Sequence, residues 1–300
     1  MIYHTPALLN ETIEGLNILP DGVYVDVTFG GGGHSRAILE RLSAKGCLVA
    51  LDQDADALAN APADERLIVQ RGNFRFLRNY LAHHGFRKVD GILADLGVSS
   101  HHFDQAVRGF SFRNADASLD MRMNTSAQLT AKDVVNRYPE DRLREIFAQY
   151  GELTDAARLA RQIVTARQDT VIERCGQLIE AIGKCIPRGA ENKYLAKVFQ
   201  ALRIETNREL ENLKSLLMQS VELLPQGGRL VIIAYHSLED RLTKNFFKNG
   251  MFEGNAEKDI YGNVDVPFRT VNNRAIVPTD GEIAINNRAR SAKLRIGIRN

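Results

Sequence analysis

The chain has few cysteines, three in 300 residues, and they are widely separated in the sequence. Cys47, Cys175 and Cys185 have neither the spacing of a metal site nor the even number of a disulfide framework, which indicates a reducing compartment. No apolar run approaches the roughly 20 residues that span a bilayer. The N-terminal segment lacks the basic and apolar regions of a secretory signal. We therefore expect a cytoplasmic protein with no membrane segment and no bound metal.

The chain also has no excess of charge of one sign. Its net charge is +2 with 25% charged residues, so the overall charge does not by itself indicate a nucleic-acid partner. The hydrophobic fraction of 44% is ordinary for a globular protein. This length is sufficient for one large domain or two smaller ones. The oligomeric state stays open, with a homo-oligomer as one option.

Short apolar runs recur along the chain at the spacing of an α/β fold. They begin at Val23, Cys47, Leu67, Val89 and Gly227. Near-continuous apolar runs separated by helical patterns predict a parallel sheet with crossover helices. A weakly alternating stretch from Glu282 ends in KLRIGIRN and predicts a final edge strand, whereas residues 249–281 are expected to form a long loop or hairpin.

The strand pattern stops for over a hundred residues between the fourth and fifth runs. In this gap apolar residues recur at the i, i+3, i+4, i+7 spacing of amphipathic helices, for example across 143–150 and 156–164. We therefore predict a discontinuous sheet domain, residues 1–106 and 205–300, interrupted by an all-helical subdomain at 107–204.

The first apolar run leads into four glycines and a helical pattern, VDVTFGGGGHSRAIL from Val25. A strand, a tight turn and a helix are typical of a nucleotide site, and three kinds compete. A P-loop would need Gly-Lys-Ser/Thr, which does not follow. The dinucleotide pattern G-x-G-x-x-G, counted from Gly30, is incomplete because its third glycine is Ser35. The third kind, an S-adenosylmethionine (SAM) site, needs glycines for close backbone approach and a helix N-terminus for the SAM carboxylate.

Two carboxylates follow later strands of the predicted sheet. Asp52 ends the second run, where it can accept both ribose hydroxyls of NAD or SAM, and the alternative is a solvated helix cap. Asp95 ends the fourth run, at the edge where ligands collect in open α/β sheets. A polar residue there holds the target nitrogen in amino-group methyltransferases, although the prolines and aromatic residue that usually follow it are missing.

Eight short motifs stand in one order over nearly the whole chain: HTPALLNE, TFGGGGHS, DLGVSS, RGFSF, LDMRMN, FQALRIETN, HSLEDR and RARSAKLRI. Together they resemble the bacterial 16S ribosomal RNA cytosine-N4 methyltransferases of the MraW/RsmH family. The resemblance implies a Rossmann-like SAM-dependent methyltransferase sheet with an inserted helical domain. It further implies SAM as cofactor and the N4 amine of a cytidine in the decoding centre of 16S rRNA as target. The expected partner is therefore 16S rRNA or the small ribosomal subunit.

The resemblance also implies cofactor contacts for particular residues. By position in the motifs, these fall on Gly32, Gly33, His34, Asp52, Phe74 and Asp95. His102 stands where the family often has a glutamine, and its ring still offers one donor and one acceptor. Phe74 is expected to lie against adenine, with the apolar core as the alternative. For His34 we expect the backbone N–H, rather than the ring, to be the useful group.

Further candidates concern catalysis and the helix that follows the fifth strand. His236, in AYHSLED, is expected to point toward the same sheet edge as Asp95, so both are candidate catalytic residues. A hydrogen bond from the cytosine amine to Asp95 would help to localise the nitrogen lone pair and take up charge. Glu239 and Asp240 are interpreted as caps of the next helix.

Arginines and aromatics interleave at the start of the insertion. The candidates for binding rRNA are Arg108, Phe110, Phe112 and Arg113, because arginine binds phosphate and an aromatic ring stacks on a splayed base. A packed hinge is the alternative. A basic segment near the end of the sequence is a second candidate surface for binding rRNA. The alternative is that this segment is only a solvated charged face. This basic tail comprises Arg288, Arg290, Lys293, Arg295 and Arg299.

Three other functions remain open from the sequence. Cytosine-C5 methylation would need a cysteine nucleophile near the fourth strand, and none of the three cysteines is placed there. An NAD-dependent oxidoreductase could use the same glycine turn and Asp52. A non-catalytic RNA-binding module could retain the fold.

Overall fold

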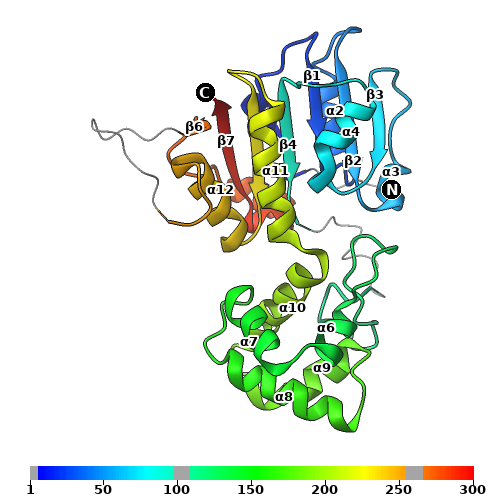
Figure 1. The fold of residues 1–300 in the computed structure, drawn as a ribbon, viewed down its shortest axis with the longest axis vertical. Coiled ribbons are helices and arrows are strands. Elements are labelled where there is room, and N and C mark those ends of the chain that lie inside the picture. Colours follow the sequence, from blue (N-terminus) through cyan, green and yellow to red (C-terminus); the bar gives the residue numbers. More distant parts are fainter. Residues whose placement is uncertain (1–5, 98–107, 255–265) are drawn as a thin grey trace. The chain divides into compact units, whose positions relative to one another are not determined.

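The computed structural model describes residues 6–97, 108–254 and 266–300. The chain divides into two compact units, one formed by residues 1–97 with 210–300 and the other by residues 98–209. The first unit contains the sheet and the second is helical (Figure 1). No helix within the described ranges is long and apolar enough to cross a membrane.

Within the described residues, seven strands form one sheet in the order β3-β2-β1-β4-β5-β7-β6. The five strands predicted from the apolar runs pair in parallel, as expected for an α/β fold. They are β1 (Val23–Asp26), β2 (Cys47–Asp52), β3 (Leu67–Arg71), β4 (Gly91–Asp95) and β5 (Arg229–Ala234). The strand order reverses between β1 and β4, and this switch point is where open α/β sheets bind ligands.

The last predicted strand lies in a different place from the one expected. β7 (Lys293–Arg299) is antiparallel and lies between β5 and β6, so it is an internal strand and the prediction of an edge strand was wrong. Its Leu294 and Ile296 are buried, and a Cβ on Gly297 would lie only 2.9 Å from the Phe247 ring. The edge strand on this side of the sheet is β6 (Phe268–Thr270), which lies within the stretch expected to be a loop or hairpin.

Helices cover both faces of the sheet. Successive side chains of each strand point to opposite faces, so each face has its own hydrophobic core. Ile92 and Ala94 of β4 pack on one face with helices α4, α11 and α12, whereas Leu93 packs on the other with α1 and α2. The helices and turns of this unit are α1 (Leu9–Leu16), α2 (Gly33–Leu39), α3 (Ala55–Leu58), η1 (Phe74–Phe76), α4 (Leu77–His83), α11 (Glu209–Leu223), α12 (Ser237–Asn249), α13 (Asp280–Ile285) and η4 (Asn287–Ser291).

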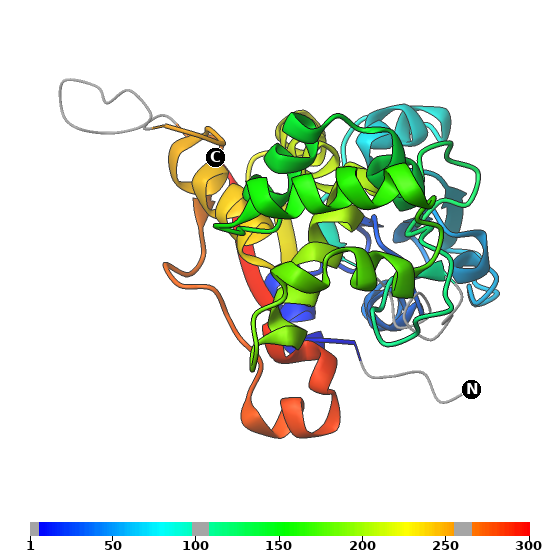
Figure 2. The same ribbon diagram turned by 90° about the horizontal axis from the view of Figure 1, so that it is seen from below.

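The helical unit has a hydrophobic core of its own, which includes Phe147, Leu159 and Leu202. Its helices, drawn mostly in green in Figure 2, are α6 (Ala131–Arg137), α7 (Glu140–Gln149), α8 (Ala156–Asp169), α9 (Cys175–Ala181), η3 (Gly183–Cys185) and α10 (Glu191–Asn207). The boundary predicted after residue 204 falls inside α10. The helix ends at Asn207, and the next residue, Arg208, adopts a left-handed conformation with φ 52°. The predicted start at residue 107 lies outside the described residues.

Candidate active site

The four-glycine segment forms the turn between β1 and α2. Gly30 and Gly32 have φ angles of 52° and 74°, in the left-handed region that favours glycine. A Cβ on Gly32 would lie 2.6 Å from the Phe29 ring, and a Cβ on Gly33 would lie 2.8 Å from Pro6. Helix α2 then begins with no side-chain capping bond at its N-cap. Close packing therefore requires glycine at two predicted cofactor positions, and backbone N–H groups of the first turn remain for other partners.

Asp26, at the end of β1, bonds to residues on both sides of the glycine turn and was not among the residues predicted from the sequence. It is 1% exposed, and its Oδ2 accepts a 2.7 Å hydrogen bond from the Ser35 hydroxyl. Its Oδ1 accepts the Thr28 N–H at 3.1 Å. Burial raises the pKa of Asp26, although the Ser35 bond opposes the shift. A single acid inside the apolar run VDVTF was the available signal, because a buried carboxyl must find hydrogen-bond partners.

Asp52 joins the glycine turn to the turn that follows β2. Its Oδ2 accepts the Gly30 N–H and its Oδ1 accepts the Asp54 N–H, each at 2.9 Å. The cap of α3 is Asp54, whose carboxylate accepts the Asp56 N–H. Asp52 is therefore not the helix cap considered as its alternative role, and it lies at the carboxyl end of β2, where a ribose contact was predicted.

Asp95 lies at the carboxyl end of β4, next to the glycine turn. Its backbone N–H donates to the Thr28 hydroxyl at 2.7 Å, and its Oδ1 accepts the Tyr235 hydroxyl at 2.8 Å. Its Oδ2 lies 3.7 Å from His34 Nδ1. Burial, aided by the negative charge of Glu239, raises the pKa of Asp95 to about 7 against the opposing effect of the Tyr235 bond. The side chain keeps 22% of its surface exposed, so a substrate atom can reach it.

The ring of His34 has a structural role that the sequence analysis did not anticipate. Its Nε2 lies 3.1 Å from the carbonyl oxygen of Ala7, which can only accept, so Nε2 carries the proton and Nδ1 faces Asp95. Burial lowers the pKa of His34, which favours the neutral ring. The expected cofactor contact of the His34 backbone N–H stays a prediction.

The turn after β5 brings Tyr235 to the site. The Tyr235 N–H donates to Glu239 Oε2 at 3.0 Å, and His236 Nε2 lies 3.2 Å from Glu239 Oε1. Glu239 lies in the first turn of α12 and is 2% exposed. Its carboxylate accepts the N–H of Tyr235, the residue before the N-cap, which is similar to the helix-capping role predicted for Glu239. The predicted catalytic residue His236 packs against Glu239, and its neighbour Tyr235 is the residue that contacts Asp95.

The structure gives less support for the predicted cofactor contacts of Phe74 and His102. Phe74 follows β3 at the start of η1, is 8% exposed and belongs to the core cluster of the sheet unit. Most of its ring therefore serves the apolar core, the alternative considered for it. His102 lies outside the described residues.

The four residues predicted to bind rRNA divide into packed and exposed ones. Phe110 is 7% exposed in the core of the helical unit, and the Arg108 guanidinium lies 5.5 Å from its ring centre. Arg108 also donates to the backbone oxygen of Met123 at 3.0 Å. Phe112 is partly buried, with its ring packed against that core. Arg113 is exposed. Of the four, Phe110 is therefore buried, Arg108 and Phe112 keep part of their surface exposed, and Arg113 is the most exposed.

Much of the basic tail is engaged within the protein. Asp240 accepts hydrogen bonds from Arg295 at 2.6 Å and from Lys293 at 3.3 Å, so it pairs with β7 and is not simply a helix cap. Arg299 donates to the backbone oxygen of Val221 at 3.1 Å. These contacts favour a structural role for at least three of the five tail cations.

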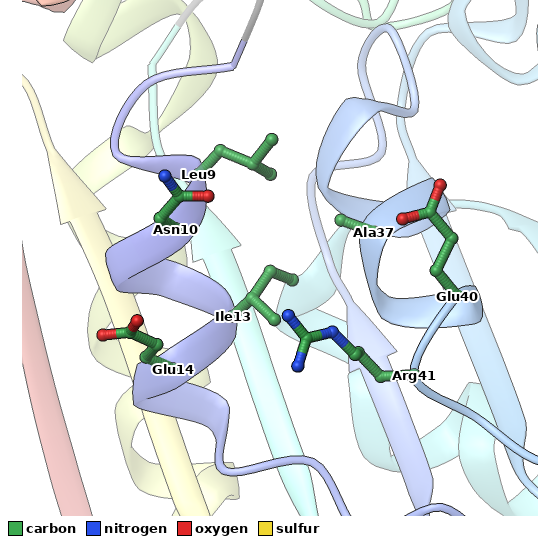
Figure 3. A pocket seen from close by; sticks show the side chains of 7 residues that line it. All are labelled: Leu9, Asn10, Ile13, Glu14, Ala37, Glu40 and Arg41. Carbon is green, nitrogen blue, oxygen red and sulfur yellow. The ribbon is translucent and has the colours of Figure 1, made fainter.

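A surface groove lies between α1 and α2 (Figure 3). Leu9, Ile13 and Ala37 form its apolar part, and the Arg41 side chain extends toward Ile13. None of the predicted cofactor or catalytic residues lines this groove, so we do not assign it to the active site.

Comparison with known proteins identifies the family. Residues 1–299 match the model of the MraW methylase family. The chain is 57% identical over 296 residues to "Ribosomal RNA small subunit methyltransferase H" of Flavobacterium johnsoniae, covering 99% of this chain and 97% of that protein. The protein of the same name from Parabacteroides distasonis is 57% identical over 98% of this chain and 96% of its own length. The chain therefore belongs to the MraW methylase family, the family that its motifs predicted.

Proposed function

We propose that the protein transfers a methyl group from SAM to the N4 amine of a cytidine in the decoding centre of 16S rRNA. Membership of the methylase family supports methyl transfer, and the name shared by the relatives supports small-subunit rRNA as substrate. SAM is the cofactor of this family and supplies an electrophilic methyl group on a sulfonium. The choice of cytosine N4 rests on the ordered motifs and on the position of Asp95.

The residues at the switch point between β1 and β4 fit SAM. Left-handed glycines at 30 and 32 allow the backbone to approach a ligand closely. The uncapped first turn of α2 suits a carboxylate. Each oxygen of Asp52 accepts one backbone N–H, which fixes the carboxylate at the carboxyl end of β2, where it suits the ribose hydroxyls.

The observation that carries the proposal is the Asp95 carboxyl, half-buried beside the glycine turn with a pKa of about 7. The lone pair of cytosine N4 is delocalised into the ring, so the amine is a poor nucleophile. A hydrogen bond from N4–H to Asp95 localises this pair as the nitrogen attacks the methyl carbon. The new N–C bond forms while the S–C bond breaks, and Asp95 accepts the proton released from N4. A pKa near neutrality suits such a base.

Cytosine-C5 methylation is disfavoured by the positions of the cysteines. Cys47 begins β2, at the end of the strand opposite Asp52. Cys175 and Cys185 belong to the core of the helical unit. Burial raises the pKa of Cys175 to about 11, which makes it a weak nucleophile at neutral pH.

The test is labelled methyl transfer from SAM to small subunits that lack the modification, followed by nuclease digestion and mass spectrometry of the nucleosides. We expect N4-methylcytidine with the parent protein and much less with Asp95→Asn. Formation of 5-methylcytidine, or no transfer with SAM binding intact, would overturn the proposal.

We further propose that the helical insertion recognises the rRNA. Arg113 supports this role because it is an exposed cation on that unit. Arg113→Ala should weaken rRNA binding and lower the salt dependence of the affinity by about one counterion, while SAM affinity stays unchanged. Arg137→Ala is the matched control, because Arg137 is also exposed but pairs with Asp133 at 3.3 Å. Equal effects of both variants would contradict a specific role for Arg113.

A further inference from the structure

We propose that Tyr235 is a positioning residue for methyl transfer, acting through its hydroxyl hydrogen bond to Asp95. The inference rests on the proposed role of Asp95 and adds a residue from the turn after β5. The Tyr235 hydroxyl donates to Asp95 Oδ1 at 2.8 Å, while the Asp95 backbone is fixed through the Thr28 hydroxyl. With Oδ1 engaged, the orientation of the carboxylate is set, and Oδ2 remains for a substrate proton.

Tyr235 is itself held in place by its surroundings. Its backbone N–H donates to the buried carboxylate of Glu239, which belongs to the first turn of α12. Its ring faces Gly97, where a Cβ would lie 3.4 Å from Tyr235 Cδ2. Gly97 has a φ of 98°, so a larger residue there would be strained as well as crowded. Contacts from α12 and from the end of β4 thus fix the hydroxyl donor before any substrate binds.

Charged and titratable groups face Asp95 from several elements. Glu239 of α12 raises its pKa, and the Tyr235 hydroxyl lowers it. Burial lowers the pKa of His34 on α2, and burial raises the pKa of Asp26 on β1. The Tyr235 pKa lies well above its usual value because of burial and the Asp95 charge, so the phenol stays protonated and keeps donating. Removal of the Tyr235 hydroxyl removes the effect that lowers the pKa of Asp95. The pKa of Asp95 should therefore rise further, because burial and the charge of Glu239 still raise it.

Tyr235→Phe tests the inference in the full-length protein, with SAM and small subunits lacking the modification as substrates. The loss of one hydrogen bond to a charged acceptor should lower kcat at neutral pH about tenfold to hundredfold, with little change in SAM affinity. Because the carboxylate is the active form, activity rises with pH through the Asp95 pKa. The acid limb of kcat/KM, near pH 7 in the parent, should move to higher pH in the variant.

Tyr24→Phe is the matched control. Tyr24 is 1% exposed on β1, and its hydroxyl accepts the Leu19 N–H at 2.7 Å. This variant also loses a buried hydroxyl in the same unit, so it reports any general loss of stability. We expect its acid limb to coincide with that of the parent.

A double-mutant cycle separates a positioning role from a structural one. If Tyr235 acts through Asp95, Tyr235→Phe should have little further effect on kcat in an Asp95→Asn background. Full additivity, or an unmoved acid limb in Tyr235→Phe, would overturn the inference while leaving N4 methylation by the parent intact. Failure of the parent to form N4-methylcytidine would instead overturn the proposed function.

Discussion

Replacing Asp52 by alanine should weaken both the glycine turn and SAM binding. Asp52 Oδ2 holds the Gly30 N–H and Oδ1 holds the Asp54 N–H, both at 2.9 Å. Alanine removes both acceptors, together with the carboxylate proposed to bind the ribose. The effect should therefore be visible in the protein alone as well as in its complex with SAM.

The contacts of Asp52 set the expected magnitude. A hydrogen bond to a charged group contributes about 1.5–3 kcal/mol. Asp52 is only half-buried, so water replaces part of each lost bond. We take the lower value for each, which lowers the free energy of unfolding of the sheet unit by about 3 kcal/mol. The loss of ribose contacts should then weaken SAM binding by a further factor of about 10–100.

Urea denaturation followed by circular dichroism measures the first effect, and calorimetric titration with SAM measures the second. Asp21→Ala is a suitable control, because it also removes a carboxylate that accepts a hydrogen bond, here from the Ser43 hydroxyl, at an exposed position outside the predicted site. Unfolding and SAM affinity in Asp52→Ala that match those of the control would refute the assignment of Asp52 as both a turn anchor and a ribose ligand.

Two further predictions concern the same site. Gly32→Ala places a side chain at a φ of 74° and 2.6 Å from the Phe29 ring, so it should lower the free energy of unfolding by at least about 1–2 kcal/mol and weaken SAM binding; a urea midpoint equal to that of the parent would contradict this. Asp95→Asn should lower kcat about 100-fold and remove the acid limb near pH 7, with SAM affinity changed little; a folded variant that retains this limb would assign the titration to another group.

The parallel part of the sheet could be predicted because β1, β2, β4 and β5 are mostly buried and therefore read as continuous apolar runs, whereas β3, at the sheet edge, is only partly buried. The positions of β6 and β7 in the sheet could not be predicted from the sequence. β6 has only three residues, and the insertion of β7 beside β5 depends on hydrogen bonding between distant segments. The predicted boundary after residue 204 preceded the end of α10 at Asn207, because helical periodicity continues on both sides of that residue.

The predicted site depends on residues at strand ends, and these lie where expected. Asp52 is the last residue of β2, and Asp95 is the last residue of β4. Both positions could be predicted because a polar residue after an apolar run marks the end of a buried strand. Contacts between strands were not predictable in the same way. Which of two neighbouring residues, Tyr235 or His236, faces Asp95 depends on the local backbone after β5, and the sequence pattern alone favoured the histidine.

The position of β7 has a consequence for synthesis of the chain. β7 pairs with β5 from Arg229 to Ala234, and the backbone of Arg299 bonds to Gly227 and Gly228. On a translating ribosome, β5 therefore keeps one unpaired, apolar edge until residues 293–299 have emerged. The helical unit has a core formed by residues between 110 and 202, so it has no such dependence on residues 293–299. A stop codon before residue 293 would leave β5 as an exposed edge, which is a recognised site of aggregation.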